Sequence, residues 1–228
     1  MVKGLALAAL AATFVMAQEN RPDHRLRAAA DTFQEIMSTP DKGIPSDLVS
    51  RAECIVILPG VKKGAFIVGG EFGKGFAECR HGNGWSGPAA VELGGGSVGF
   101  QIGGSSTDLV LLVMNERGMH HLLEDKFTLG ADAAVAAGPV GRTAEANTDA
   151  SLHAEILAWS RSRGVFAGIA LNGAVLKADP DENEKLYGRA VTNHEVLRGD
   201  VRPPAGARIL TAELDHYPAT AGNADRSR

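Results

Sequence analysis

Glycine recurs every few residues between positions 59 and 104, inside segments whose other residues are typical of β-strands. The pattern is plain in GAFIVGGEFGKGFAE at 64–78 and in GGGSVGFQIGG at 94–104. Glycine in a strand contributes no side-chain packing and costs backbone entropy. Its repeated use therefore indicates bulges, sharp bends, or the close approach of another backbone or a ligand. This region constrains the shape of the molecule more than its chemistry.

The remaining segments alternate between short helices and strands. Hydrophobic spacing predicts helices at 24–38, 46–52, 119–127, near Asp181 and at 206–217, and strands at 54–58, 65–70, 72–79, 89–93, 97–103, 108–114, 155–162, 164–171 and 173–178. Pro59-Gly60 predicts a turn after the first strand. Because no long helices separate the strands, we predict one α+β domain over residues 18–217, with a disordered tail at 218–228. Its core is a mainly antiparallel, glycine-rich sheet or barrel-like structure with a few short packing helices.

The first seventeen residues carry the three parts of a secretory signal. Lys3 supplies a positive charge, residues 5–15 are apolar, and Val15-Met16-Ala17 is a small-residue cleavage pattern. The apolar run is shorter than the roughly 20 residues that span a bilayer. We predict a signal peptide at 1–17, cleaved after Ala17, and a periplasmic or secreted mature protein. The alternative is a buried N-terminal helix.

Charge and cysteine content narrow the choice of partners. The net charge is −4 at pH 7 and there is no long basic run, which argues against nucleic acid as the main partner. Cys54 and Cys79 are the only cysteines. In an oxidising compartment they permit one disulfide, and the alternative is two small buried residues.

Two motifs suggest enzymatic chemistry, but neither has the context that the chemistry requires. Ser97 stands in a G-x-S-x-G pattern, yet the nucleophile elbow needs a helix after the serine, and the residues that follow alternate as in a strand. His120 and His121 are adjacent on a predicted helix and point about 100° apart, without an HExxH motif. We therefore expect no cofactor, no metal and no catalysis, and keep a serine hydrolase using Ser97 as an alternative.

Two groups of residues are candidates for binding lipid. The basic residues in or beside the glycine-rich loops are Lys62, Lys63, Lys74, Arg80 and Arg142. They form either a rim that receives an anionic headgroup or a set of solubilising charges. The apolar stripe of helix 24–38 includes Leu26, Phe33, Ile36 and Met37. It either enters a membrane interface or covers the core, and its narrow, alanine-rich character favours the core.

Many spaced blocks of this sequence resemble one family. They are DKGIP (41–45), CIVILPGVKKGAFIVGG (54–70), GKG (73–75), GWSGP (84–88), GGSVGFQIGGSSTDLVLLV (95–113), FTLGADAAVAAGPVGR (127–142), WSRSRGVFAGIALNGAVL (159–176) and YG (187–188). The resemblance extends from about residue 26 to 214. The chain is similar to the SYLF family, also called the Ysc84-type or DUF500 domain, and looks like a bacterial exported member.

The resemblance implies a lipid-binding module. Eukaryotic SYLF proteins bind phosphoinositides and related anionic lipids, and fungal members also bind actin. We recognise no SH3 or FYVE module here, and the predicted signal peptide removes the chain from cytoplasmic actin, so we do not expect actin binding. The leading hypothesis is non-catalytic binding of anionic phospholipid or a membrane surface in the cell envelope. The alternatives are the Ser97 hydrolase and a structural envelope protein that self-associates through an uncovered strand edge.

Overall fold

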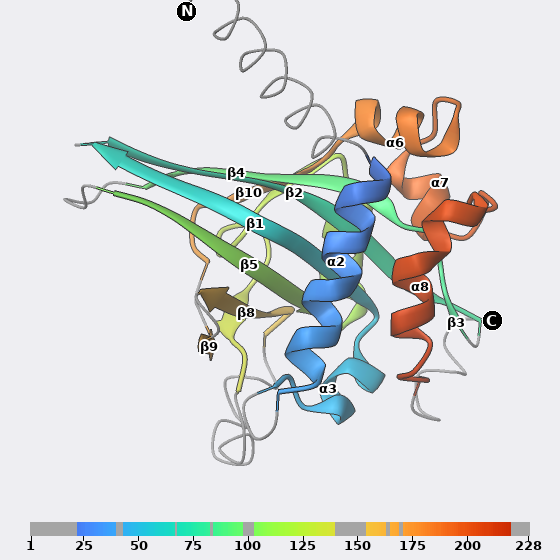
Figure 1. The fold of residues 1–228 in the computed structure, drawn as a ribbon, viewed down its shortest axis with the longest axis horizontal. Coiled ribbons are helices and arrows are strands. Elements are labelled where there is room, and N and C mark those ends of the chain that lie inside the picture. Colours follow the sequence, from blue (N-terminus) through green and yellow to red (C-terminus); the bar gives the residue numbers. More distant parts are fainter. Residues whose placement is uncertain are drawn as a thin grey trace, which may run out of the picture.

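A curled, mostly antiparallel β-sheet forms the centre of the molecule, with helices against it (Figure 1). The computed structural model describes residues 22–39, 43–66, 68–82, 84–97, 103–139, 154–162, 165–168 and 171–219. The predicted signal peptide, Arg142 and residues 220–228 of the predicted tail lie outside these ranges. The predicted α+β class and the mainly antiparallel sheet are confirmed.

The helices are α2 (Pro22–Met37), α3 (Ser46–Arg51), α4 (Glu116–Leu123), α6 (Pro180–Tyr187), α7 (Asn193–Leu197) and α8 (Arg208–Leu214), with a 3-10 helix, η2, at Ala205–Ala207. The strands are β1 (Cys54–Phe66), β2 (Val68–His81), β3 (Gly84–Trp85), β4 (Ala89–Ser97), β5 (Gly103–Val113), β6 (Lys126–Thr128), β7 (Val135–Ala137), β8 (Ile156–Ser162), β9 (Val165–Gly168) and β10 (Val175–Ala178). Their order across the sheet is β6-β10-β4-β2-β1-β5-β8-β7, with β3 on β2 and β9 on β8. Among the described strand pairs, β7 and β8 are parallel.

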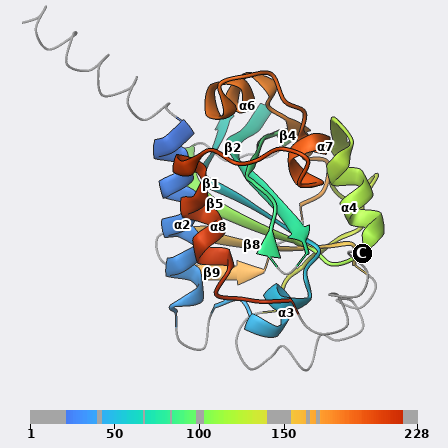
Figure 2. The same ribbon diagram turned by 90° about the vertical axis from the view of Figure 1, so that its right-hand side faces the viewer.

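The sheet separates two hydrophobic cores, and Figure 2 shows α2 and α8 on one side of it and α4 and α7 on the other. Strand β1 contributes to both. Ile55 and Ile57 belong to the core beneath α2 and α8, whereas Cys54, Val56 and Leu58 belong to the core beneath α4 and α7. We call these the α2 side and the α4 side. The apolar run of β5 alternates in the same way and lies between β1 and β8, as expected of a central strand.

The predicted turn at Pro59-Gly60 is wrong, because β1 continues through it as a bulge. The pairing register shifts there against both neighbouring strands. Gly60 has φ of +63°, a left-handed conformation that favours glycine. The backbone N–H of Gly60 donates to Oδ1 of Asp108 at 2.8 Å, and Oδ2 of Asp108 accepts from Nε of Arg161 at 2.9 Å. Arg161 also forms an ion pair with Glu35 of α2. The bulge is thus tied to β5, β8 and α2.

Cys54 and Cys79 lie directly opposite each other on β1 and β2 and form a disulfide. Both are buried. The bond joins the two longest strands at the end where the helices cover the sheet. Among the described residues, no helix combines the length and apolar character needed to cross a bilayer.

Replacing Asp108 tests the attachment of the bulge. We expect Asp108→Ala to lower the free energy of unfolding by about 2–3 kcal/mol, because a partly buried N–H and a guanidinium lose their acceptor. Asp31→Ala, at an exposed position on α2, is the control and should change it by less than about 0.5 kcal/mol. Urea denaturation measures both. Equal effects of the two substitutions would contradict the assigned role of Asp108.

The carboxyl group of Glu78 on β2 is fully buried, and neither oxygen forms a hydrogen bond of standard geometry with a described residue. Burial raises the pKa of Glu78 well above its ordinary value; nearby Thr211 opposes the rise and the charge of Asp215 adds to it. At pH values between the unfolded and folded pKa of Glu78, the folded protein therefore holds a proton on this carboxyl that the unfolded chain releases.

This raised pKa predicts a stability that declines with pH. The contribution of Glu78 is fully present below its unfolded pKa, about 4.3, and is lost as pH rises toward the folded pKa, at about 1.4 kcal/mol per pH unit. We expect Glu78→Gln to remove this decline, so that the variant gains stability over wild type above about pH 5. Denaturation between pH 4 and 8 measures it, with Glu184→Gln, an exposed position, as control. Parallel pH profiles for wild type and Glu78→Gln would refute the prediction.

Candidate functional site

The predicted basic residues do not gather into one rim. Strand alternation places Lys62 and Lys74 on the α2 side, whereas Lys63 points to the α4 side, where its ammonium lies 2.8 Å from Glu71. Arg80 lies eight residues beyond Phe72 along β2, roughly 26 Å at 3.3 Å per residue. Arg142 is outside the described residues. The hypothesis of a single five-residue rim therefore reduces to Lys62 and its surroundings.

Lys74 is engaged by two carboxylates. Its ammonium contacts Asp179, the N-cap of α6, and lies 3.4 Å from Glu92 on β4, which also pairs with Lys177. Burial lowers the pKa of Lys74, but the hydrogen bond and charge of Asp179, together with Glu92, outweigh it and the pKa is raised. These contacts attach α6 to the sheet and neutralise the lysine.

Arg80 holds the segment that follows α8 against the sheet. Its Nη2 donates to the carbonyl oxygens of Val49 at 3.0 Å and Tyr217 at 2.9 Å, and the guanidinium lies 3.7 Å from the ring centroid of Trp85. Burial lowers the pKa of Arg80 to about 10, opposed by the charges of Glu53 and Asp215, so the group stays charged at neutral pH. Arg80 has a structural role here.

The apolar stripe of α2 covers the core. Leu26, Phe33 and Ile36 are buried, at 0%, 0% and 1% exposure, and Met37 packs partly buried against them. In this structure they are not available to a membrane. The helix therefore packs on the core, as its narrow apolar stripe favoured. The placement of these four residues does not support their entering a membrane interface.

The long strands β1, β2, β4 and β5 extend past α2, and none of the described helices lies over that part of the sheet (Figure 1). On the α2 side of this extension, register aligns Gly94, Phe72, Lys62 and Ser106 in one row across the four strands. The next row on the same side consists of Gly96, Gly70, Gly64 and Gly104. We call these two rows the glycine face. Glycine has no side chain to cover the peptide backbone, and Gly70 is exposed.

Phe72 is the side chain that sequence reasoning missed. It is 51% exposed, and no other large hydrophobic side chain among the described residues is exposed. Lys62, directly opposite on β1, is exposed and forms no ion pair with a residue that the structure describes. The signal was the alternation of FGKGF at 72–76, but only the strand register shows that Phe72 and Lys62 are neighbours on one face.

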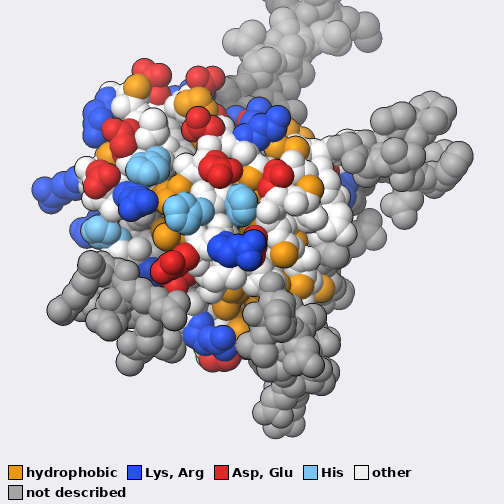
Figure 3. Space-filling model, turned by 180° about the vertical axis from the view of Figure 1, so that it is seen from behind, with side chains coloured by type: hydrophobic (Ala, Val, Ile, Leu, Met, Phe, Trp, Pro, Cys, Tyr) orange, Lys and Arg blue, Asp and Glu red, His pale blue; other side chains and the backbone are white. Residues whose placement is uncertain are grey.

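The opposite side of the molecule does not show a comparable surface. Figure 3, which views the molecule from behind, shows Lys and Arg side chains intermixed with Asp, Glu and several histidines. His121 of α4 stacks on Phe127, with ring centroids 5.8 Å apart. Over the described ranges, no three His, Cys, Asp or Glu side chains are grouped to hold a metal ion.

Ser97 is the last residue of β4, and β5 begins at Gly103. The elbow needs a helix directly after the serine, and residues 98–102 lie outside the described ranges. The Ser97 hydrolase therefore stays an untested alternative.

The placement of Arg80 and Lys62 predicts opposite consequences for stability. We expect Arg80→Ala to lower the free energy of unfolding by about 2–4 kcal/mol, because charged hydrogen bonds and the contact with Trp85 are lost. Lys62→Ala should change it by less than about 0.5 kcal/mol, because Lys62 is exposed. Thermal or urea unfolding of both variants measures this. A stable Arg80→Ala protein would show that its contacts are dispensable.

Comparisons with known proteins place the chain in a family. The family model described as "Ysc84: Las17-binding protein actin regulator" matches residues 94–217. SH3 domain-containing YSC84-like protein 1 of Homo sapiens is 35% identical over 189 residues, covering 81% of this chain and 55% of the relative. SH3 domain-containing protein PJ696.02 of Schizosaccharomyces pombe is 36% identical over 179 residues, covering 75% and 41%. LAS seventeen-binding protein 3 of Saccharomyces cerevisiae is 34% identical over 185 residues, covering 78% and 40%.

The chain spans about half the length of the curated relatives it matches. The family description names a binding protein and actin regulator, and the name of the Saccharomyces cerevisiae relative describes a binding protein. The family match covers more than half of this chain, including β5, β8, α6 and α8. This chain belongs to the Ysc84, or SYLF, family.

Proposed function

We propose that this protein binds anionic phospholipid surfaces, without catalysis, through Phe72 and Lys62 on the glycine face. The observation that carries the proposal is the exposed aromatic ring directly opposite Lys62, which has no ion pair among the described residues, at an end of the sheet that no described helix covers. An aromatic ring with a lysine beside it suits a membrane interface, because the ring enters the apolar boundary while the ammonium stays among the headgroups.

The glycine row beside these residues supports the same proposal. With no side chains on Gly64 and Gly70, a lipid headgroup or acyl chain can lie directly on the backbone of the sheet. The engaged cations Lys63, Lys74 and Arg80 do not contribute in this arrangement. The proposal therefore replaces the predicted five-residue rim with a smaller contact.

The expected affinity is modest. A lysine near an anionic surface contributes about 1 kcal/mol, and burying the exposed part of a phenylalanine contributes about 1–1.5 kcal/mol. Two such side chains give weak, salt-sensitive association. Firm attachment then requires several copies, or additional segments of the chain, on one membrane.

The proposal includes a location outside the cytoplasm, in the periplasm or beyond. It rests on the sequence prediction for residues 1–17, which lie outside the described structure. Mass spectrometry of the exported protein tests it, and a mature N-terminus at Gln18 is the expected result. An intact N-terminus in the cytoplasmic fraction would overturn this part.

Liposome co-sedimentation tests the lipid contact. We expect binding to phosphatidylglycerol vesicles at low salt, weaker binding at high salt, and little to phosphatidylcholine vesicles. Lys62→Glu changes the local charge by two and should weaken binding by about 2 kcal/mol, roughly 30-fold. Phe72→Ala should weaken binding at both salt concentrations, because its contribution is apolar.

Lys126→Glu is the matched control, because Lys126 is also exposed and has no ion pair among the described residues but lies on β6. Equal losses for Lys62→Glu and Lys126→Glu would mean that only net charge matters. No binding to either vesicle would reject the proposal.

The family description and the relatives' names point to protein partners instead. We do not extend actin regulation to this chain, because it matches only about half of those proteins. Co-sedimentation with actin filaments, run beside the vesicles, separates the two. Light scattering of the protein alone tests the remaining rival, a structural protein that self-associates.

A further inference from the structure

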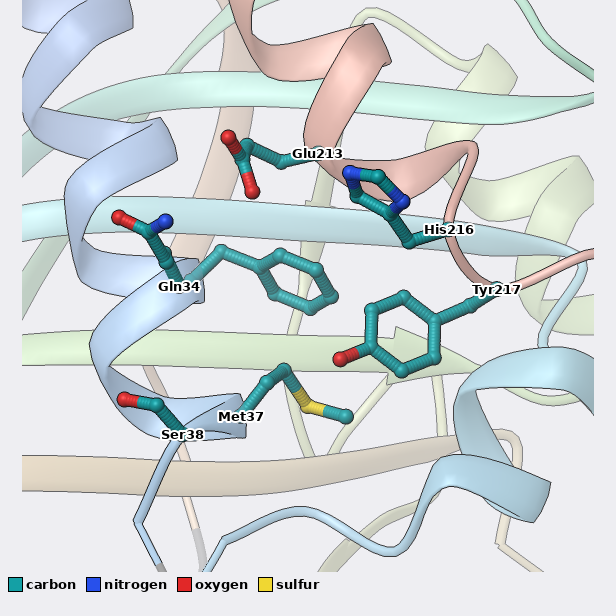
Figure 4. Close-up of a pocket in the computed structure, with 7 residues that line it drawn as sticks. Gln34, Met37, Ser38, Glu213, His216 and Tyr217 are labelled. Atoms are coloured by element: carbon teal, nitrogen blue, oxygen red, sulfur yellow. The ribbon is translucent and has the colours of Figure 1, made fainter.

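The C-terminal ends of α2 and α8 meet around a cavity of about 180 Å³ that is separate from the glycine face. It is lined by Phe33, Gln34, Met37, Ser38, Glu213, His216 and Tyr217. Figure 4 shows Tyr217 reaching from beyond α8 toward α2, with the thioether of Met37 beside its ring and Glu213 and His216 above it. The cavity therefore combines an aromatic and thioether wall with a polar rim.

Tyr217 is held in place by contacts with α2, α8 and Arg80. Its ring packs edge-on against Phe33, with centroids 5.6 Å apart. Its carbonyl oxygen accepts from Arg80, and its backbone N–H donates to the carbonyl of Leu214 at 3.0 Å. The aromatic wall is thus in place before any ligand arrives, and a partly exposed ring face is kept at the cavity.

The cavity is electrostatically suited to a cation. No lysine or arginine is among its lining residues, whereas Glu213 supplies a carboxylate. Burial raises the pKa of Tyr217, and the negative charge of Glu213 raises it further. Neither α2 nor α8 has a basic residue in its last turn. The partial negative charges of two helix C-termini therefore add to the charge of Glu213.

We propose that this cavity binds an organic ammonium group, primary or quaternary. An aromatic face with a nearby carboxylate is the arrangement that attracts such cations. Small metal ions fit less well, because magnesium and calcium need several oxygen ligands and one carboxylate is present. The ammonium belongs either to a soluble amine or to the headgroup of a zwitterionic lipid.

Titration with choline and with its uncharged carbon isostere, 3,3-dimethylbutan-1-ol, tests the proposal. Calorimetry or NMR shifts of Tyr217 in the full chain, without membranes, should detect choline and show at least fivefold weaker binding of the isostere. Glu213→Gln and Tyr217→Leu should each weaken choline binding at least fivefold, and Tyr217→Phe should retain it. Glu184→Gln, an exposed carboxylate on α6, is the control and should bind as wild type does.

Equal binding of choline and the isostere would overturn the proposal, and so would unchanged binding by Glu213→Gln or no binding at 50 mM choline. Tyr217→Leu removes a core contact, so its unfolding transition is measured beside that of Tyr217→Phe. If the leucine variant does not fold, choline binding by Glu213→Gln alone tests the proposal. Phosphatidylcholine vesicles then identify the source. If the protein binds phosphatidylcholine vesicles and Glu213→Gln abolishes that binding, the ammonium belongs to a lipid headgroup. If the protein binds choline but not the vesicles, the ammonium belongs to a soluble amine. Neither result depends on the glycine face, so the proposed function can fail while this site stands.

Discussion

The bulge at Pro59-Gly60 determines which side chains of β1 lie on each side of the sheet beyond Leu58. Up to Leu58, even-numbered residues of β1 point to the α4 side, but after the bulge Val61 lies on that side and Lys62 on the other. A shift of one residue in a strand exchanges its two faces. Asp108 fixes this shift by accepting from Gly60 while bound to Arg161, which in turn contacts Glu35. Without this shift, Lys62 would not lie opposite Phe72 on the α2 side of the sheet.

Charge pairing decides which cations are available to a partner. Lys74 and Arg80 look equivalent to Lys62 as letters in glycine-rich segments, yet one is held by Asp179 and Glu92 and the other by backbone carbonyls. These contacts attach α6 and the C-terminal segment to the sheet. The C-terminal segment that Arg80 holds also supplies Tyr217 to the cavity between α2 and α8. Both proposed surfaces lie on the α2 side of the sheet.

Membership of the SYLF family agrees with this division between scaffold and surface. The matched region contains the central strand β5 and the helices that complete the α2 side. The name of the Saccharomyces cerevisiae relative describes a binding protein, and the relatives are about twice as long as the match. The contacts that we propose involve Phe72 and Glu213, which do not belong to the buried core of this chain.

The sequence by itself determined the α+β class, the amphipathic helix near residues 24–38 and the central position of the apolar run at 108–114, because hydrophobic periodicity acts locally. The family followed from the resemblance of many spaced sequence blocks. It left the state of Cys54 and Cys79 open and mistook Pro59-Gly60 for a turn. Only the tertiary structure decided that the two cysteines are bonded, that Phe72 adjoins Lys62, and that Tyr217 packs against Phe33. Each of these depends on the register between strands, or on the packing of helices far apart in the chain. Register and packing are set by the sum of many weak contacts across the whole domain, and no single segment carries that information.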